Sequence, residues 1–269
     1  MINLTREKRI QVLNIISFLL VVIVNYLANA LPINDYQTGE VSEMYSNLFT
    51  PAGVTFSIWG IIYLLLAVFI IYQARGLFSS KKPPLELLNR IGYLFFWSSM
   101  VNIAWIFSWH YLQIVLSFIV MLVLVGVLTV IYHLRLDVGQ RQVGKYEKYF
   151  VQIPFSLYKA WITVATVANF MVLTTALKWD QGPIPGEVWA VVALIFVTLV
   201  GIFVYRKRRD IFFQLVFIWA LLGIIIKRIF VVEELVLSVV VTAILGILIL
   251  IFNMIFVQLK VEKRKYKCR

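Results

Sequence analysis

Long apolar runs determine what this chain can fold into. A helix needs about 20 mostly apolar residues to cross the hydrocarbon core of a bilayer, which is about 30 Å thick. With 62% hydrophobic and 14% charged residues, the composition lies outside the range of soluble globular domains. We therefore predict an all-α fold, a polytopic membrane helix bundle of about eight transmembrane helices. The eight runs are Ile10–Leu31, Gly53–Gln73, Ile91–Trp109, Leu112–Leu134, Tyr149–Leu177, Val188–Tyr205, Ile211–Ile226 and Leu235–Leu259.

The basic residues are concentrated in every second connection between these runs. Lys and Arg precede the first run, follow the second, fourth and sixth, and end the chain, whereas the alternate connections carry Asp and Glu with few bases. By the positive-inside rule, both termini are cytoplasmic and the protein lies in the cell (cytoplasmic) membrane. Topology and contact with the lipid bilayer then account for the net charge of +12, so we expect no nucleic acid partner.

Two connections shape the expected organisation. The breaker Gly182–Gly186 divides the chain into residues 1–180, which hold five runs, and residues 181–269, which hold three runs and a basic tail. The connection Pro32–Ala52 is long and carries aromatic residues, which fits either a cap over a cavity or a solvated hairpin.

A polar and aromatic stripe follows the fifth run. At helical spacing, Pro154, Tyr158, Trp161, Ala165 and Asn169 fall within an arc of about 80°, while the opposite face is mostly aliphatic. An unsatisfied polar group in hydrocarbon costs several kcal/mol, so this stripe is expected to face other helices or a cavity between them.

Matching stripes occur on three other runs. Trp59 and Tyr63 share a face of the second run, Asn102 and Trp105 share a face of the third, and Asn25 adds an amide from the first. One interpretation is a ligand-lined cavity, because aromatic walls with a few polar groups suit a flat and largely apolar ligand. The other is packing alone, in which amides bond neighbouring helices at about 0.6 to 2 kcal/mol each.

Lys159 is the one charge inside a run. Its direction lies about 100° from the stripe, so it either snorkels to the membrane surface or meets an anionic group of a ligand. No catalytic set, nucleotide-binding loop or metal-binding cluster is recognisable. His110, at the outer end of the third run, and His133, near the inner end of the fourth, are expected on opposite sides of the membrane, so we predict no catalytic residues, no metal site and a non-enzymatic protein.

Residues 10–178 resemble the tryptophan-rich sensory protein family, also called the TspO or peripheral benzodiazepine receptor family. The segment Pro154–Asn169, PFSLYKAWITVATVAN, is similar to the family's fifth-helix pattern of Pro, Tyr, Ala-Trp, Ala-Thr and Asn. Asn102-x-x-Trp105 resembles its third helix, and Trp59-x-x-x-Tyr63 after Pro51 resembles its second.

Some positions depart from the family pattern. Phe56 stands three residues before Trp59 where the family has four, Lys159 replaces an apolar residue, and Phe170 without a following Arg breaks the sterol-recognition motif. The three additional helices resemble the longer bacterial members.

The resemblance implies a five-helix bundle with a cavity, capped by the loop after the first helix, that binds porphyrins, sterols or related hydrophobic ligands. It also implies a homodimer and a role between sensing and transport, with a porphyrin or haem as ligand and no certain cofactor. We accordingly expect a tetrapyrrole-like ligand in this cavity. The alternatives are a permease or exporter of a small amphipathic molecule, a structural subunit with no ligand, and enzymatic conversion of a bound tetrapyrrole. The expected ligand-binding residues are Asn25, Trp59, Tyr63, Asn102, Trp105, Tyr158, Lys159, Trp161 and Asn169.

Overall fold

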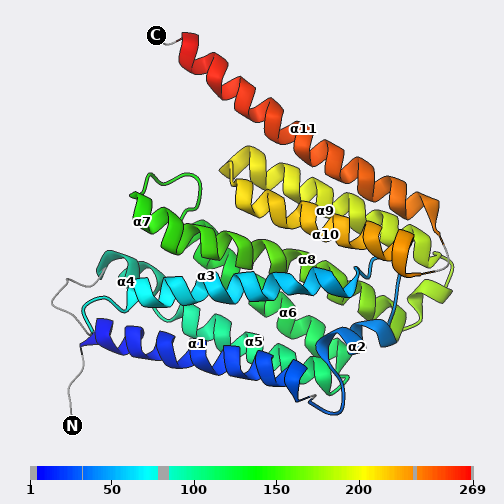
Figure 1. The fold of residues 1–269 in the computed structure, drawn as a ribbon, viewed down its shortest axis with the longest axis horizontal. Helices are drawn as coiled ribbons and strands as arrows, with labels where there is room; N and C mark the ends of the chain where they lie inside the picture. Colours follow the sequence, from blue (N-terminus) through cyan, green and yellow to red (C-terminus); the bar gives the residue numbers. More distant parts are fainter. Residues whose placement is uncertain (1–4, 32, 78–84, 233–234, 268–269) are drawn as a thin grey trace.

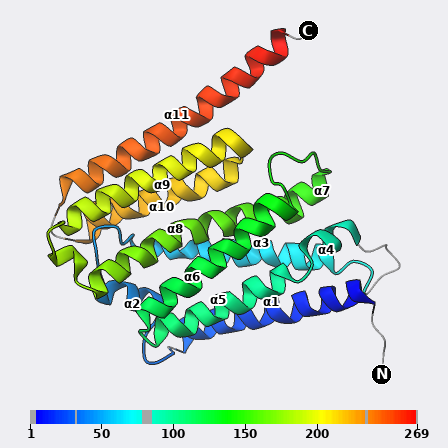
Figure 2. The same ribbon diagram turned by 180° about the vertical axis from the view of Figure 1, so that it is seen from behind.

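The computed structural model describes residues 5–31, 33–77, 85–232 and 235–267, and these form a bundle of long helices (Figures 1 and 2). Seven of its helices are long and apolar enough to cross a membrane, or eight when α4 and α5 are counted as one bent span. The prediction of an all-α membrane bundle of about eight spans is therefore confirmed. The α-helices are α1 (Arg6–Ala30), α2 (Thr38–Met44), α3 (Ile58–Gln73), α4 (Leu85–Ile91), α5 (Leu94–His110), α6 (Ile114–Thr129), α7 (Lys145–Glu147), α8 (Ile153–Ala176), α9 (Gly186–Arg208), α10 (Ile211–Ile226) and α11 (Leu237–Lys267).

Shorter turns extend several of these helices. A 3₁₀ turn, η1 (Gly53–Ser57), leads into α3, and π turns follow α6 as η2 (Val130–Arg135) and α10 as η5 (Lys227–Val231). The π turn η3 (Lys148–Gln152) leads into α8, whose second residue, Pro154, has no N–H to donate to the helical ladder. A second 3₁₀ turn, η4 (Trp179–Gln181), follows α8.

The third predicted span is broken near its start. Gly92 has a φ of +56° directly after α4, and such a left-handed residue ends a helix. α4 and α5 are consequently bent by 47° relative to each other. The long straight part of this span is α5, which matches the predicted run Ile91–Trp109 from Leu94 onward.

α8 is the central span. It packs against α3, α6, α9 and α10, and 67% of the most apolar stretch of its span is buried, against 33% to 50% in the other six candidate spans. α1 packs against α3 and α5 on one side of the bundle, and α11 packs against α9 and α10 on the other (Figure 1). α1 begins and α11 ends at the same end of the bundle, which we call the terminal end.

The two halves of the chain are joined at the terminal end. Gly139, with a φ of +78°, lies so close to α9 that an added Cβ would come within 1.8 Å of the Arg208 carbonyl oxygen. Arg208 also pairs with Asp137, and the Tyr132 hydroxyl donates to Asp210 over 2.7 Å. The helices after residue 180 thus pack directly on the first five; the domain boundary at 180/181 stays a prediction.

Residues 33–57 lie at the opposite end, which we call the loop end, and contain α2 and η1 (Figure 2). We call this segment the cap. α2 packs against α5, and η1 packs against α10. The cap therefore bridges the first five helices and the last three. Pro32, where the predicted loop begins, lies outside the described residues.

Candidate ligand-binding site

An aromatic cluster centred on Trp59 lies between α3, α5 and α8. The Trp59 ring stacks on Tyr63 at a centroid distance of 5.4 Å and on Trp105 at 6.5 Å. It meets Tyr158 and Trp161 edge to face, each at 6.3 Å. These are the offset and edge-on arrangements that aromatic rings prefer. The stripes predicted on three separate runs therefore face one another.

A chain of hydrogen bonds lies behind this cluster. The Asn25 amide of α1 donates to Asn102 Oδ1 over 3.0 Å, and Asn102 Nδ2 donates to the Tyr158 hydroxyl over 3.3 Å. Asn102 is fully buried. The Tyr63 hydroxyl lies beside the same amide without a well-formed hydrogen bond. Since polar groups in hydrocarbon must find partners within the bundle, this network fixes α1, α5 and α8 relative to one another.

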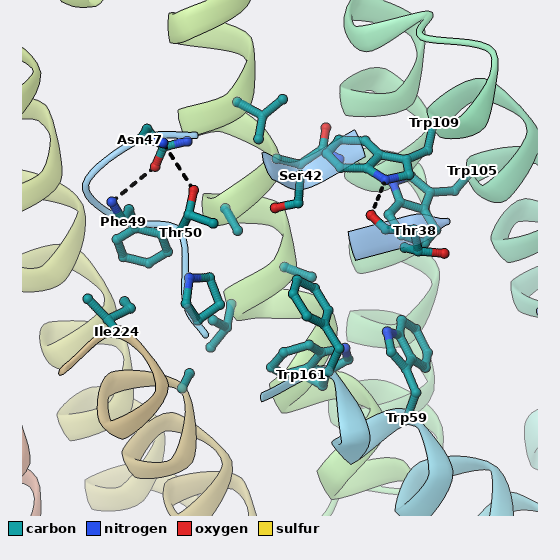
Figure 3. A pocket seen from close by; sticks show the side chains of 18 residues that line it. Thr38, Ser42, Asn47, Phe49, Thr50, Trp59, Trp105, Trp109, Trp161 and Ile224 are labelled. Carbon is teal, nitrogen blue, oxygen red and sulfur yellow. Dashed lines mark hydrogen bonds between the residues drawn. The ribbon is translucent and has the colours of Figure 1, made fainter. Parts of the chain in front are cut away.

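A pocket lies between the cap and the cluster (Figure 3). Its volume is about 50 Å³, and we call it the inner pocket. Three tryptophans from different helices, Trp59, Trp105 and Trp161, surround it in Figure 3. The lining residues are Thr38, Ser42, Asn47, Phe49, Thr50, Pro51, Phe56, Trp59, Trp105, Trp109, Trp161, Val164, Ala165, Ala168, Asn169, Val172, Ala220 and Ile224.

A larger groove of about 730 Å³ adjoins the inner pocket on the α1 side. The two cavities share Thr38, Phe56, Trp59 and Trp105, so these side chains stand between them. Tyr26, which also lines the groove, is 69% exposed, and the groove is therefore open toward the side of the bundle. We call it the lateral groove. Its lining residues are Val22, Asn25, Tyr26, Asn29, Ala30, Gln37, Thr38, Gly39, Gly53, Phe56, Trp59, Tyr63 and Trp105.

The cap closes the loop end of the inner pocket. The Trp109 indole N–H donates to the Thr38 carbonyl over 3.0 Å, and His110 Nε2 lies 3.0 Å from the Thr38 hydroxyl. Asn47 holds the following turn, since its Oδ1 accepts from the Phe49 N–H and its own N–H donates to Thr50 Oγ1 (Figure 3). Of the two interpretations of the loop, the structure agrees with a cap.

The lining of both cavities is uncharged. No Asp, Glu, Lys or Arg of the described chain lines either of them. The indole N–H groups of Trp105 and Trp161 are buried and make no hydrogen bond with described residues. Buried indole N–H groups ordinarily have an acceptor, and the buried indole N–H of Trp189, which lines neither cavity, also makes no hydrogen bond with described residues. No group of three or more described His, Cys, Asp or Glu side chains could hold a metal ion.

The predicted site residues fall into three groups. Asn25 and Tyr63 line the lateral groove, Trp161 and Asn169 line the inner pocket, and Trp59 and Trp105 line both. Asn102 and Tyr158 form the hydrogen-bonded layer behind the cluster and line neither cavity. The Asn169 amide oxygen accepts from the Ser117 hydroxyl of α6 over 3.2 Å, which holds its side chain in place.

Lys159 lies apart from the other eight residues. Its ammonium group donates to the Val125 carbonyl of α6 over 3.4 Å, its side chain is buried, and it lines neither cavity. The angular offset from the stripe, visible in the sequence, agrees with this placement.

Sequence reasoning missed two parts of the site. The cap contributes Ser42, Phe49 and Thr50 to the inner pocket, and α10 contributes Ala220 and Ile224. No feature of the sequence distinguishes small and aliphatic residues in a span that line a cavity from those that only pack. The isolated Trp219 was the available signal, since its indole N–H donates to the Thr55 carbonyl of the cap over 3.0 Å.

Comparison with known families gives one match. The sequence model of the family described as TSPO-like protein matches residues 11–256. The match extends from α1 into α11 and so includes the last three helices. No curated protein and no solved structure matches the chain.

Proposed function

Because the chain belongs to the TSPO-like protein family, we propose that this multi-pass membrane protein binds a flat, tetrapyrrole-like hydrophobic ligand in the aromatic cavity beneath the cap. The observation that carries the proposal is the convergence of Trp59, Trp105 and Trp161, from three different helices, on one pocket that adjoins an open groove.

The dimensions suit a ligand that lies mainly in the lateral groove. A volume of about 730 Å³ falls in the range of about 300 to 1,000 Å³ typical of small-molecule sites. The inner pocket, at about 50 Å³, accommodates only an edge of such a molecule. A flat ring system would stack on Trp59 and Trp105, which separate the two cavities.

The lining also restricts the charge of the ligand. Burying a carboxylate in an uncharged and largely apolar cavity costs several kcal/mol unless a cation or several donors compensate. Any carboxylate of a tetrapyrrole would therefore remain at the open side of the groove. The buried portion of the ligand is uncharged.

Binding of protoporphyrin IX and of its dimethyl ester to the detergent-solubilised protein tests this proposal. We expect both to bind, the ester at least as tightly as the free acid. Trp105→Ala and Trp161→Ala should each weaken binding about fivefold or more, since loss of a large aromatic contact removes about 1 to 3 kcal/mol. Trp97→Ala is the matched control, because Trp97 lies on α5 with 56% exposure and lines neither cavity. The absorbance of the porphyrin should be the readout, because the substitutions remove intrinsic fluorophores. Unchanged affinity in both cavity variants would refute the site.

The proposed setting is the cell membrane, with both termini cytoplasmic and contact with the lipid bilayer. The support is the positive-inside pattern together with the common end at which α1 begins and α11 ends. Protease accessibility of a C-terminal tag in right-side-out vesicles tests the orientation: the tag should be protected, and its cleavage would contradict it.

The proposed physiological role is sensing or transport of the bound ligand, by a homodimer. Ligand accumulation in sealed vesicles containing the protein separates transport from sensing. Accumulation above that of empty vesicles would favour the permease or exporter alternative, and binding without accumulation would favour a sensor. Cross-linking in the membrane at low protein density tests the dimer. If the protein is a dimer, a product of twice the chain mass should form.

A further inference from the structure

The cap has a second set of attachments, made by α10 and η5. The Ala52 N–H donates to the Gly223 carbonyl of α10 over 2.9 Å, and the Trp219 indole donates to the Thr55 carbonyl. At the start of η5, Lys227 Nζ lies 2.5 Å from Glu43 Oε1 of α2. These contacts extend from Glu43 of α2 to Thr55 of η1, over the second half of the cap, and α10 and η5 supply all of them.

α10 and the cap approach each other very closely at Gly223. A Cβ placed on this glycine would lie 2.0 Å from Thr55 Oγ1 and 2.8 Å from Thr55 Cγ2. Thr55 is fully buried in η1. Only glycine at position 223 permits the Ala52–Gly223 backbone hydrogen bond together with the burial of Thr55, so the two segments are shaped to dock.

The Glu43–Lys227 ion pair joins an exposed partner to a buried one. The Lys227 side chain is only 6% exposed, whereas the Glu43 side chain is 47% exposed. A buried ammonium group is costly without a counter-charge, and Glu43 is the carboxylate that the described residues provide within 4.0 Å. If the cap moved away from the bundle, Lys227 would lose the Glu43 carboxylate as its counter-charge. Lys227 is the first residue of η5, so its buried ammonium group could reach water only if η5 also moved.

The same helix forms part of the cavity wall. Ala220 and Ile224 of α10 line the inner pocket, one turn apart, and Gly223 between them contacts the cap. On the opposite side, hydrogen bonds join the beginning of the cap, at Ile33, Asn34 and Thr38, to the end of α5. Opening the pocket at its loop end therefore requires the cap to separate from α10.

We propose that α10 and η5 act as a latch that holds the cap over the inner pocket, with the Glu43–Lys227 pair as its polar contact, and that this latch sets the rate at which ligand exchanges. The part concerning ligand exchange rests on the proposed function; the part concerning cap closure does not. The additional helices are on this view a component of the site.

The test of cap closure uses a cysteine beneath the cap. Ala165 lines the inner pocket and lies on α8, away from Glu43, so Ala165→Cys in a Cys268→Ser background provides a single reporter thiol. Its rate of alkylation by a small water-soluble maleimide is measured in the solubilised full-length protein without ligand. Glu43→Gln is expected to raise this rate about tenfold, as expected for loss of one charge-assisted contact. Asp35→Asn is the matched control, because Asp35 lies exposed in the same cap and has a left-handed φ that Asn tolerates.

If a single substitution impairs folding, the double variant Glu43→Lys with Lys227→Glu still tests the latch, because it exchanges the two charges and retains an ion pair. Restoration of slow alkylation in this double variant, relative to Glu43→Lys alone, supports a direct pair. Equal rates in the wild type, Glu43→Gln and Asp35→Asn would overturn the latch.

A second experiment measures the rate at which protoporphyrin IX dimethyl ester dissociates from the protein after dilution. Glu43→Gln should accelerate dissociation by a factor similar to its effect on alkylation. Faster alkylation with unchanged dissociation would overturn the control of ligand exchange. If the ester does not bind the wild type, the proposed function fails, and the alkylation rates alone still decide whether the cap is latched.

Discussion

Gly223→Ala should destabilise the protein although Ala is the better helix former. In a helix interior, Ala is favoured over Gly by about 0.5 to 1 kcal/mol. The added Cβ, however, would lie 2.0 Å from Thr55 Oγ1, so the cap or α10 must move by more than 1 Å to restore van der Waals contact, as judged against about 3.5 Å for unstrained atoms. Overpacking of this kind costs about 1 to 3 kcal/mol, and more at the severe end. We expect a net destabilisation of about 1 to 2 kcal/mol and a fall of several degrees in the melting temperature.

Gly126→Ala provides the matched control. Gly126 lies within α6, and a Cβ built on it meets no atom within 4 Å. The same chemical change should therefore stabilise the protein by about 0.5 to 1 kcal/mol. Both variants are compared with the wild type by thermal unfolding in one detergent. A Gly223→Ala variant that is as stable as Gly126→Ala would refute the close docking of α10 on the cap.

Two further substitutions test the cluster and its surroundings. Asn102→Leu leaves the Tyr158 hydroxyl and the Asn25 amide without one hydrogen-bond partner each, so the free energy of unfolding should fall by about 1 to 2 kcal/mol in thermal unfolding. The control is Asn29→Ala, which removes an exposed hydrogen bond within α1. A loss of stability no larger than that of the control would contradict the network. Lys159→Met should leave the porphyrin affinity within about twofold of that of the wild type, because the Lys159 ammonium group donates to the Val125 carbonyl and lines neither cavity. A tenfold loss of affinity would instead place Lys159 in the site.

The membrane spans and the aromatic cluster could be predicted because both follow from periodicity. Apolar run length predicts a span, and residues three or four positions apart share a helix face, so the convergence of Trp59, Trp105 and Trp161 was accessible without coordinates. The break at Gly92 escaped prediction because a single left-handed residue leaves the apolar run unchanged.

The contribution of α10 could not be predicted from its sequence. Ala220 and Ile224 have the composition of a packing face, and only the tertiary arrangement shows that they border a cavity. The attachment of the cap depends on residues far apart in the chain, Glu43 and Lys227, and no local pattern links them. Such long-range pairs emerge only when the bundle is assembled.

Whether a flat, uncharged ligand occupies the aromatic cavity beneath the cap is best decided by an experimental structure of the protein with protoporphyrin IX dimethyl ester in a lipid nanodisc. We expect a planar ligand stacked on Trp59 and Trp105 in the lateral groove, with its inner edge at Trp161. A ligand bound on the outer surface of the helices, without contact to Trp105 and Trp161, would contradict the proposed site.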